Sequence, residues 1–274
     1  MMESHAKDES VLALFGSEMR LERTRAKMSQ SELAAKCFCT QSLLSKIEAT
    51  KRLPSEDLAK RLDEIFKTGG RFERMWPTVV RHAYPVWFRP YVELEAAATH
   101  IQTFEAQIVP GLLQTEDYAR AVFGTERGRN TGILLDARMA RQRILDRDEP
   151  PLLWFIMDET ALRRNIGGAE VMRAQMERML HVIEQTPTVI QVVPFDVGVR
   201  PGLSGSFATL SFDDGPDVLY EESFYEGQLR GEKEPVGTAR DAYDLLRAVA
   251  LSPGASADLI ASIAKDTSWV YRLT

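Results

Sequence analysis

Polar and apolar residues between positions 29 and 48 follow a helical period that is broken once, near residues 37–39. Ser29 is a predicted N-cap because its hydroxyl can accept an otherwise unpaired backbone N–H, and Glu32 completes a capping box. Thr40 caps a second segment in the same way. The apolar face of that second segment consists of Leu43, Leu44 and Ile47. The pattern therefore predicts two short helices joined by a tight turn.

The face opposite these apolar residues carries side chains that both donate and accept hydrogen bonds. Such side chains on a helix can read base edges in the DNA major groove, and Gln41 is placed to bind adenine in a bidentate manner. Gln30, Lys51 and Arg52 are suited to phosphate oxygens. The predicted DNA-binding residues are Gln30, Thr40, Gln41, Ser42, Ser45, Lys46, Lys51 and Arg52.

This segment resembles the helix-turn-helix of phage-repressor-like regulators, the xenobiotic-response-element family. The resemblance extends over residues 11–67 and rests on Ser29-Gln30, Leu33-Ala34, the run 44–48 and Pro54-Ser55. It implies an all-α, five-helix domain of the lambda-repressor type that binds a double-stranded DNA operator. Phe38 departs from the family, which has Gly at this turn, and a bulky residue is strained at positive φ. A helical hairpin that serves only protein contacts is the alternative.

After residue 87 the hydrophobic pattern mixes strand and helix periods. Strands are predicted at 100–107, 152–157 and 188–195, the last as a continuous apolar run typical of a central strand. Residues 206–212 and 218–224 form a predicted hairpin. Helices are predicted at 132–147, 169–185, 238–251 and 255–265. The fold class is therefore α+β with a mixed sheet for this part of the chain.

The predicted helix 169–185 carries a stripe rich in methionine. Its members are Met172, Met176, Met179, Leu180 and Ile183. Methionine fills irregular gaps in cores and also occurs at adaptable binding surfaces. We interpret the stripe as core, with a binding surface as the alternative.

These elements divide the chain into a helix-turn-helix domain at residues 1–70, a linker helix at 71–86 and an α+β domain at 87–274. The segment 67–70 ends the predicted fifth helix, and Gly69-Gly70 forms a hinge. Pro77 is expected to interrupt the linker helix. The third domain is expected to bind an effector or partner, or to dimerise.

A second resemblance covers nearly all of residues 87–265. It rests on motifs at 87–95, 109–120, 137–142, 193–195 and 201–207. They are similar to an actinobacterial family of regulators in which a helix-turn-helix precedes a domain of unknown function, sometimes labelled antitoxin-like. The resemblance implies a transcriptional regulator encoded beside a small partner protein. It brings no ligand and no catalytic residue with it.

Charge supports DNA binding only locally. The chain of 274 residues has a net charge of −6, which argues against a protein that coats nucleic acid indiscriminately. Residues 20–61 carry a net charge of +5, whereas residues 71–274 carry −7. A basic patch on an acidic protein fits one specific DNA-binding face, and an ordinary solvated helix surface is the alternative.

Other classes of function find little support in the sequence. Cys37 and Cys39 are interpreted as small hydrophobic residues. Two cysteines this close in sequence rarely meet disulfide geometry, and the four histidines lack the spacing to form a metal site with them. Gly202-Leu203-Ser204-Gly205-Ser206 lacks the second glycine of a nucleophile elbow. We expect no enzyme activity, no cofactor and no metal. The absence of an apolar run at the N-terminus, or of one long enough to span a bilayer, predicts a cytoplasmic protein without membrane attachment.

The role of the α+β domain has two alternatives. It binds a small co-encoded protein, as an antitoxin-like interaction module or a dimerisation surface, or it holds a small molecule in a pocket. The candidate contacts in either case are Trp87, Tyr91, Gln107, Tyr220, Glu222 and Tyr225. Because one helix-turn-helix reads only half of a two-fold operator, a homodimer is expected.

Overall fold

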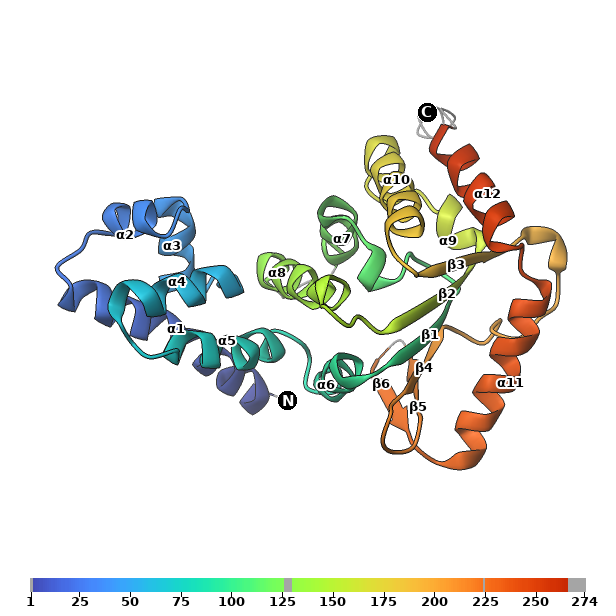
Figure 1. Ribbon diagram of the computed structural model, residues 1–274, viewed down its shortest axis with the longest axis horizontal. Helices are drawn as coiled ribbons and strands as arrows, with labels where there is room; N and C mark the ends of the chain where they lie inside the picture. Colours follow the sequence, from blue (N-terminus) through green and yellow to red (C-terminus); the bar gives the residue numbers. More distant parts are fainter. Residues whose placement is uncertain (1, 126–129, 224, 266–274) are drawn as a thin grey trace. The chain divides into compact units, whose positions relative to one another are not determined.

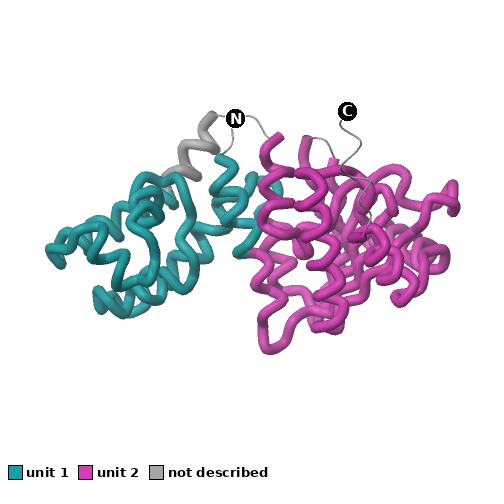
Figure 2. Tube along the Cα trace, turned by 90° about the horizontal axis from the view of Figure 1, so that it is seen from above, with its two compact units in different colours: residues 1–89, 126–140 teal, residues 90–125, 141–274 magenta. Residues whose placement is uncertain are grey.

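The computed structural model describes residues 2–125, 130–223 and 225–265. The chain forms two compact units, of which the first comprises residues 1–89 and 126–140 and the second comprises residues 90–125 and 141–274. Figure 2 shows each unit in its own colour. The boundary falls within helix α8 (Thr131–Gln142), so the first unit is assembled from two separate stretches of chain.

The first unit is all-α over the helix-turn-helix region, as predicted (Figure 1). Its helices are α1 (Met2–Arg25), α2 (Gln30–Lys36), α3 (Gln41–Glu48), α4 (Glu56–Phe66) and α5 (Arg71–His82). From the sequence, the helix that ends before Lys67 is expected to be the fifth. It is the fourth of these helices. The fifth is the predicted linker helix, which packs against α1 and α4.

The expected interruption at Pro77 is wrong, because α5 runs through this residue. Proline removes one backbone hydrogen bond and disfavours a helix interior. Phe72, Val79 and Val80 lie on the same helix and are buried. Their burial on both sides of Pro77 holds the helix together despite the lost hydrogen bond.

The core of the first unit fixes α3 against α1. Phe15 and Phe72 are fully buried and meet edge to face, with ring centroids 5.2 Å apart. Gly16 of α1 faces the end of α3, and a Cβ on Gly16 would lie 2.7 Å from the carbonyl oxygen of Ile47. The absence of a side chain therefore permits the close approach of the two helices.

Asp63, in the last turn of α4, caps the start of α5. The residue before α5 is Gly70, which has no side chain to cap the helix. Instead the Asp63 carboxylate accepts hydrogen bonds from the backbone N–H groups of Phe72, at 3.0 Å, and Glu73, at 2.8 Å, and from the Thr68 hydroxyl. Asp63 thereby joins α4 to α5 across the Gly69-Gly70 turn.

The second unit contains a six-stranded mixed sheet, as the α+β prediction required (Figure 1). The strands are β1 (His100–Glu105), β2 (Leu152–Asp158), β3 (Val189–Val193), β4 (Phe207–Ser211), β5 (Val218–Glu222) and β6 (Gly227–Arg230). Their order is β3-β2-β1-β4-β5-β6. The β1–β2 and β2–β3 pairs are parallel, whereas β4, β5 and β6 pair antiparallel.

Helices surround this sheet in the second unit. They are α6 (Arg89–Ala97), which begins at the unit boundary, α7 (Glu116–Phe123), the end of α8, α9 (Glu159–Arg163), α10 (Ala169–Gln185), α11 (Lys233–Val249) and α12 (Pro253–Lys265). Short 3-10 turns occupy Gly111–Leu113, Arg143–Asp146 and Phe195–Val197. α11 packs against β3, β4 and β5, and α12 packs against β3 and α10.

β3 lies at one edge of the sheet and is not the central strand predicted from its apolar run. Its free edge is covered by the segment that leads into α12 and by the first turn of α12. The Val192 N–H donates to Ser256 Oγ at 3.0 Å, and the Leu251 N–H donates to the Val192 carbonyl at 2.9 Å. An edge covered in this way is as apolar as a central strand, which explains the sequence pattern.

Several elements of the second unit have no counterpart in the sequence prediction. These are α6, α9 and β6, and the start of α11 at Lys233 rather than near residue 238. The predicted hairpin 206–212 and 218–224 is present as β4 and β5, although residue 224 lies outside the described residues. Met172, Met176 and Met179 are fully buried, which confirms the interpretation of this stripe as core.

Candidate nucleic-acid interface

The turn between α2 and α3 accepts Phe38 in the left-handed conformation. Its φ is 54°, and its side chain is 80% exposed. The Arg61 guanidinium lies over the ring, 4.6 Å from its centroid. The helix-turn-helix therefore keeps its tight turn at the position where the family has glycine, and the strain is retained rather than removed by reshaping.

Both predicted caps form. The Ser29 hydroxyl accepts the backbone N–H of Glu32, whose carboxylate accepts the N–H of Ser29, so the capping box is complete. The Thr40 hydroxyl accepts the N–H of Leu43 at 3.2 Å. Thr40 thus uses its side chain to start α3, and its position at the DNA face remains a prediction.

α3 has one buried face and one polar face. Leu44 and Ile47 are fully buried, and Leu43 is half-buried. On the other side the side chains of Gln41, Ser42 and Lys46 are exposed, and Ser45 is half-exposed. The helix therefore presents a short polar surface suited to base edges in a major groove.

A chain of hydrogen bonds holds Gln41, the first residue of α3 predicted to contact bases. Gln41 Nε2 donates to Gln30 Oε1 at 2.6 Å, and Gln30 Nε2 donates to Glu48 Oε2 at 2.9 Å. Arg23 of α1 donates from Nε and Nη2 to the two oxygens of Glu48, at 2.8 and 3.1 Å. Gln30, predicted to bind phosphate, thus links α2 to both ends of α3 and orients Gln41.

The Arg23–Glu48 ion pair anchors this chain inside the unit, since the two side chains are only 14% and 8% exposed. Burial raises the pKa of Glu48, but hydrogen bonds from Arg23 and Gln30 and the charge of Arg23 outweigh burial. The pKa of Glu48 therefore lies below its ordinary value, and the carboxylate is charged at neutral pH. Arg23 also donates from Nη1 to the Met28 carbonyl at 2.9 Å, which fixes the turn before α2.

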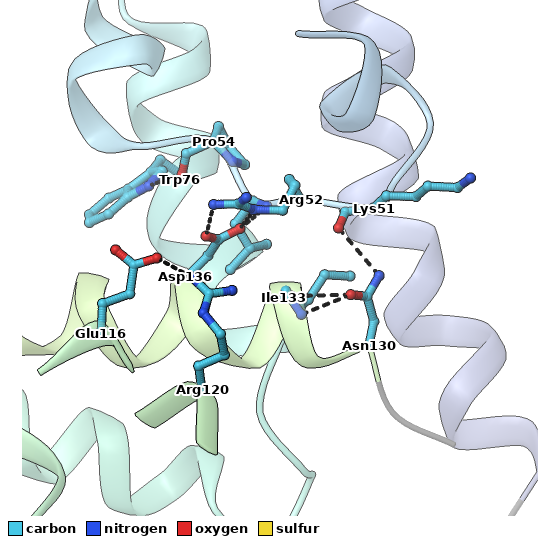
Figure 3. A network of polar contacts seen from close by, with 11 residues as sticks. Lys51, Arg52, Pro54, Trp76, Glu116, Arg120, Asn130, Ile133 and Asp136 are labelled. Atoms are coloured by element: carbon cyan, nitrogen blue, oxygen red, sulfur yellow. Dashed lines mark hydrogen bonds and ion pairs between the residues drawn. The ribbon is translucent and has the colours of Figure 1, made fainter. Parts of the chain in front are cut away.

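The two basic residues after α3 differ in their surroundings. Lys51 is exposed, as a phosphate-binding residue should be. Arg52 is half-exposed and forms a bidentate pair with Asp136 of α8, with Arg52 Nε 2.7 Å from Oδ2 and Nη2 2.6 Å from Oδ1. Figure 3 shows this pair, and both partners lie in the first unit.

The cysteines sit in the turn as free thiols. Cys37 is buried and Cys39 is half-buried. Burial, together with the neighbouring Cys39, raises the pKa of the Cys37 thiol to about 11. A thiol with so high a pKa is a poor nucleophile at neutral pH, in agreement with the interpretation of Cys37 as a small hydrophobic residue.

The structure brings together three of the six candidate contacts in the α+β region. The rings of Tyr91 and Tyr220 lie 4.2 Å apart, and the Tyr220 hydroxyl donates to Glu222 at 3.1 Å. Tyr91 and Tyr220 are buried, so they pack the interior of the second unit. Trp87 belongs to the first unit.

The remaining candidates, Gln107 and Tyr225, are exposed on loops. A hollow of about 510 Å³ in the second unit is lined by Thr99, His100, Gln102, Ser211, Phe212, Asp213, Asp217, Arg240 and Asp244. None of the six candidate contacts lines this hollow. The hollow is therefore separate from the six candidate contacts, whose role in binding stays a prediction.

Sequence reasoning missed the long-range pairs that support α3 and the loop after it. Arg23 and Glu48 are 25 positions apart, and Arg52 and Asp136 are 84 apart. No local pattern marks such pairs.

A helix-turn-helix with a formed turn, two capped helices and an exposed polar face on the second helix defines a DNA-binding regulator. A family model described as "Helix-turn-helix domain" matches residues 14–74. A second, described as "Domain of unknown function (DUF5753)", matches residues 88–262. The chain belongs to the DUF5753 family.

Two further comparisons add no relative. No curated protein and no solved structure matches the chain. Over the described residues, every helix is too short or too polar to cross a membrane. Among the same residues, His, Cys, Asp and Glu side chains nowhere gather in a group of three that could hold a metal ion.

Proposed function

We propose that this protein is a sequence-specific transcriptional regulator that reads an operator through α3. Gln41, Ser42, Ser45 and Lys46 contact base edges, and Lys51 contacts a phosphate. The observation that carries this proposal is the Gln41–Gln30–Glu48–Arg23 chain of hydrogen bonds. It holds an exposed glutamine at the start of a helix whose other face is buried, and such preorganisation lowers the cost of binding.

The second unit is proposed to control this binding by taking up a small protein encoded beside the regulator. The family resemblance is the only support for that partner. A small-molecule effector is the competing proposal. The net negative charge of residues 71–274 suits a positively charged binding partner, whether protein or small molecule.

The first test is a selection of duplex DNA from a randomised library with the full-length protein. Recovery of one motif is expected, and its affinity is then measured by fluorescence anisotropy for the wild type and for Gln41→Ala. The substitution should cost about 1–3 kcal/mol on the selected duplex and relax the preference at one base pair, because a bidentate contact is lost.

Ser31→Ala, at an exposed position of α2, is the matched control and should leave affinity and preference as in the wild type. Failure to recover any motif would contradict sequence-specific binding. Equal affinity and equal sequence preference of wild type and Gln41→Ala would remove Gln41 from the reading face.

A further inference from the structure

The loop that follows the reading helix is held by a helix that lies 84 residues further along the chain. The Asp136 carboxylate of α8 accepts three hydrogen bonds from this loop. Two come from the Arg52 guanidinium, at 2.7 and 2.6 Å, and the third comes from the Leu53 backbone N–H at 2.9 Å (Figure 3). Asp136 is only 15% exposed in this arrangement.

Two more contacts seat α8 in the first unit. The Asn130 side chain accepts the Gly132 N–H at 3.0 Å at the start of α8, and it donates from Nδ2 to the Lys51 carbonyl at 3.3 Å. At the other end, the Tyr84 hydroxyl donates to the Ala137 carbonyl at 2.6 Å. The loop residues Lys51 and Arg52 are therefore both fixed by α8, through backbone and side chain respectively.

A carboxylate and a phosphate compete for the same donors on an arginine. The guanidinium binds either anion through two parallel N–H groups, and the Nε and Nη2 groups of Arg52 are those bound by Asp136. We propose that Asp136 limits the affinity for DNA, because its carboxylate occupies the Arg52 donors that an operator phosphate would take. This inference rests on the proposed function, in which the end of α3 lies beside the DNA backbone.

The C-terminal end of α8 is held by contacts within the second unit. Beyond the unit boundary, α8 ends with Arg141, whose Nε lies 2.6 Å from a carboxylate oxygen of the buried Glu95. Gln142 donates from Nε2 to the carbonyls of Gly111 and Gln114, at 2.8 and 2.7 Å. A change in the contacts of Arg141 and Gln142 alters how readily Asp136 leaves Arg52. DNA binding changes the stability of those contacts by the same free energy.

The test compares five full-length proteins: wild type, Asp136→Asn, Arg52→Ala, the double variant, and Glu64→Gln. Glu64 is an exposed acid of α4, so its substitution controls for the loss of one negative charge in the same unit. Fluorescence anisotropy is recorded with the duplex recovered by selection and with a scrambled duplex of the same length, over a range of salt concentrations.

Asp136→Asn should tighten binding to both duplexes by about two- to fivefold, the range that a partly exposed ion pair is worth. The slope of log K against log salt should become steeper by about 0.9, since one more phosphate is neutralised. The gain should vanish in the Arg52→Ala background, and Glu64→Gln should show neither effect, because distant exposed charges are screened.

Unchanged or weaker binding by a folded Asp136→Asn variant overturns the proposal, as does a gain that persists without Arg52. Binding of neither duplex by the wild type is a different result, because it overturns the proposed function itself. Circular dichroism checks that each variant is folded.

Hydrogen exchange on the wild type provides a measurement that needs no variant. Peptides from residues 131–140 should exchange faster when the selected duplex is bound, because Asp136 is released. Slower or unchanged exchange in these peptides overturns the proposal.

Discussion

Phe38 occupies backbone geometry that glycine adopts freely and that costs other residues roughly 1–2 kcal/mol. The cation–π contact with Arg61 returns about 0.5–1 kcal/mol at an exposed site. The turn is therefore tolerated at a small net cost and does not require glycine. The remaining strain is balanced by the buried faces of α2 and α3 on either side.

Asp63 accepts three hydrogen bonds, from the Thr68 hydroxyl and from the backbone N–H groups of Phe72 and Glu73. Burial raises the pKa of its carboxyl, but hydrogen bonds from Thr68 and from the backbone N–H groups at the start of α5 outweigh burial. The pKa of Asp63 therefore lies below its ordinary value. A carboxyl of this kind stabilises the fold above its unfolded pKa, and the contribution is lost as the pH falls through the folded value.

We predict that Asp63→Ala lowers the free energy of unfolding by about 1–2 kcal/mol at pH 7, because the cap of α5 is lost. The difference from wild type should shrink below about pH 4, where the carboxyl of the unfolded wild type takes up a proton, and it is lost as the pH falls through the lowered pKa of the folded carboxyl. Urea denaturation followed by circular dichroism at pH 7 and near pH 3 measures both values. Glu64→Gln, the neighbouring exposed acid, should lie within about 0.5 kcal/mol of wild type. A constant difference at both pH values would contradict the role of the charge.

At the scale of elements, the contact between α1 and α3 sets where the reading face lies. α3 is a short helix of eight residues that depends on packing for its placement. Its C-terminal end meets α1 at Gly16, where the Ile47 carbonyl approaches too closely for any side chain. The position of α3 is thus fixed by a glycine of another helix.

We predict that Gly16→Val separates α1 from α3, at a cost of about 1–3 kcal/mol in unfolding free energy from overpacking. The affinity for the selected duplex should fall as well, because the reading helix is displaced. Ser17→Val introduces the same side chain at the adjacent exposed position and should cost less than about 0.5 kcal/mol. Thermal unfolding and anisotropy on both variants measure the effects. Equal behaviour of the two variants would show that the close approach does not matter.

The elements that sequence analysis predicted are those whose signals are local. Ser29 and Thr40 cap helices through residues three positions away, so their spacing is visible in the sequence. Asp63 caps a helix from nine and ten positions away, and no pattern reports that distance. The apolar run of β3 indicates only that its residues are buried. Residues of a covered edge strand and of a central strand are both buried, so the run does not distinguish them.

The candidate site divides in the same way. The polar face of α3 follows from helical periodicity and is exposed as predicted. Whether Arg52 is a surface cation or one side of an ion pair depends on a residue 84 positions later. That information lies in the tertiary fold and could not come from the pattern around Arg52. The contact role of Trp87, Tyr91 and the other candidates stays a prediction.

For the whole molecule, operator recognition requires two reading helices. A single α3 covers only part of one groove, and two-fold pairing places two such helices ~34 Å apart. We predict that the full-length protein is a homodimer that binds an inverted repeat. Sedimentation equilibrium, alone and with the selected duplex, measures the stoichiometry, and a duplex with one half-site scrambled should bind at least about tenfold more weakly. A monomer in both conditions would contradict this prediction.

The division of the first unit between two stretches of chain also sets an order of events on the ribosome. The helix-turn-helix leaves the ribosome before Asp136 has been synthesised, since 84 residues separate it from Arg52. At about 5–20 residues per second this interval lasts roughly 4–17 s. During that time the nascent regulator already carries its reading helix but lacks the carboxylate that binds Arg52. If Asp136 competes with phosphate for Arg52 as proposed, a newly made chain passes through an interval of stronger attraction to nucleic acid, and fragments that end before residue 130 keep that property permanently.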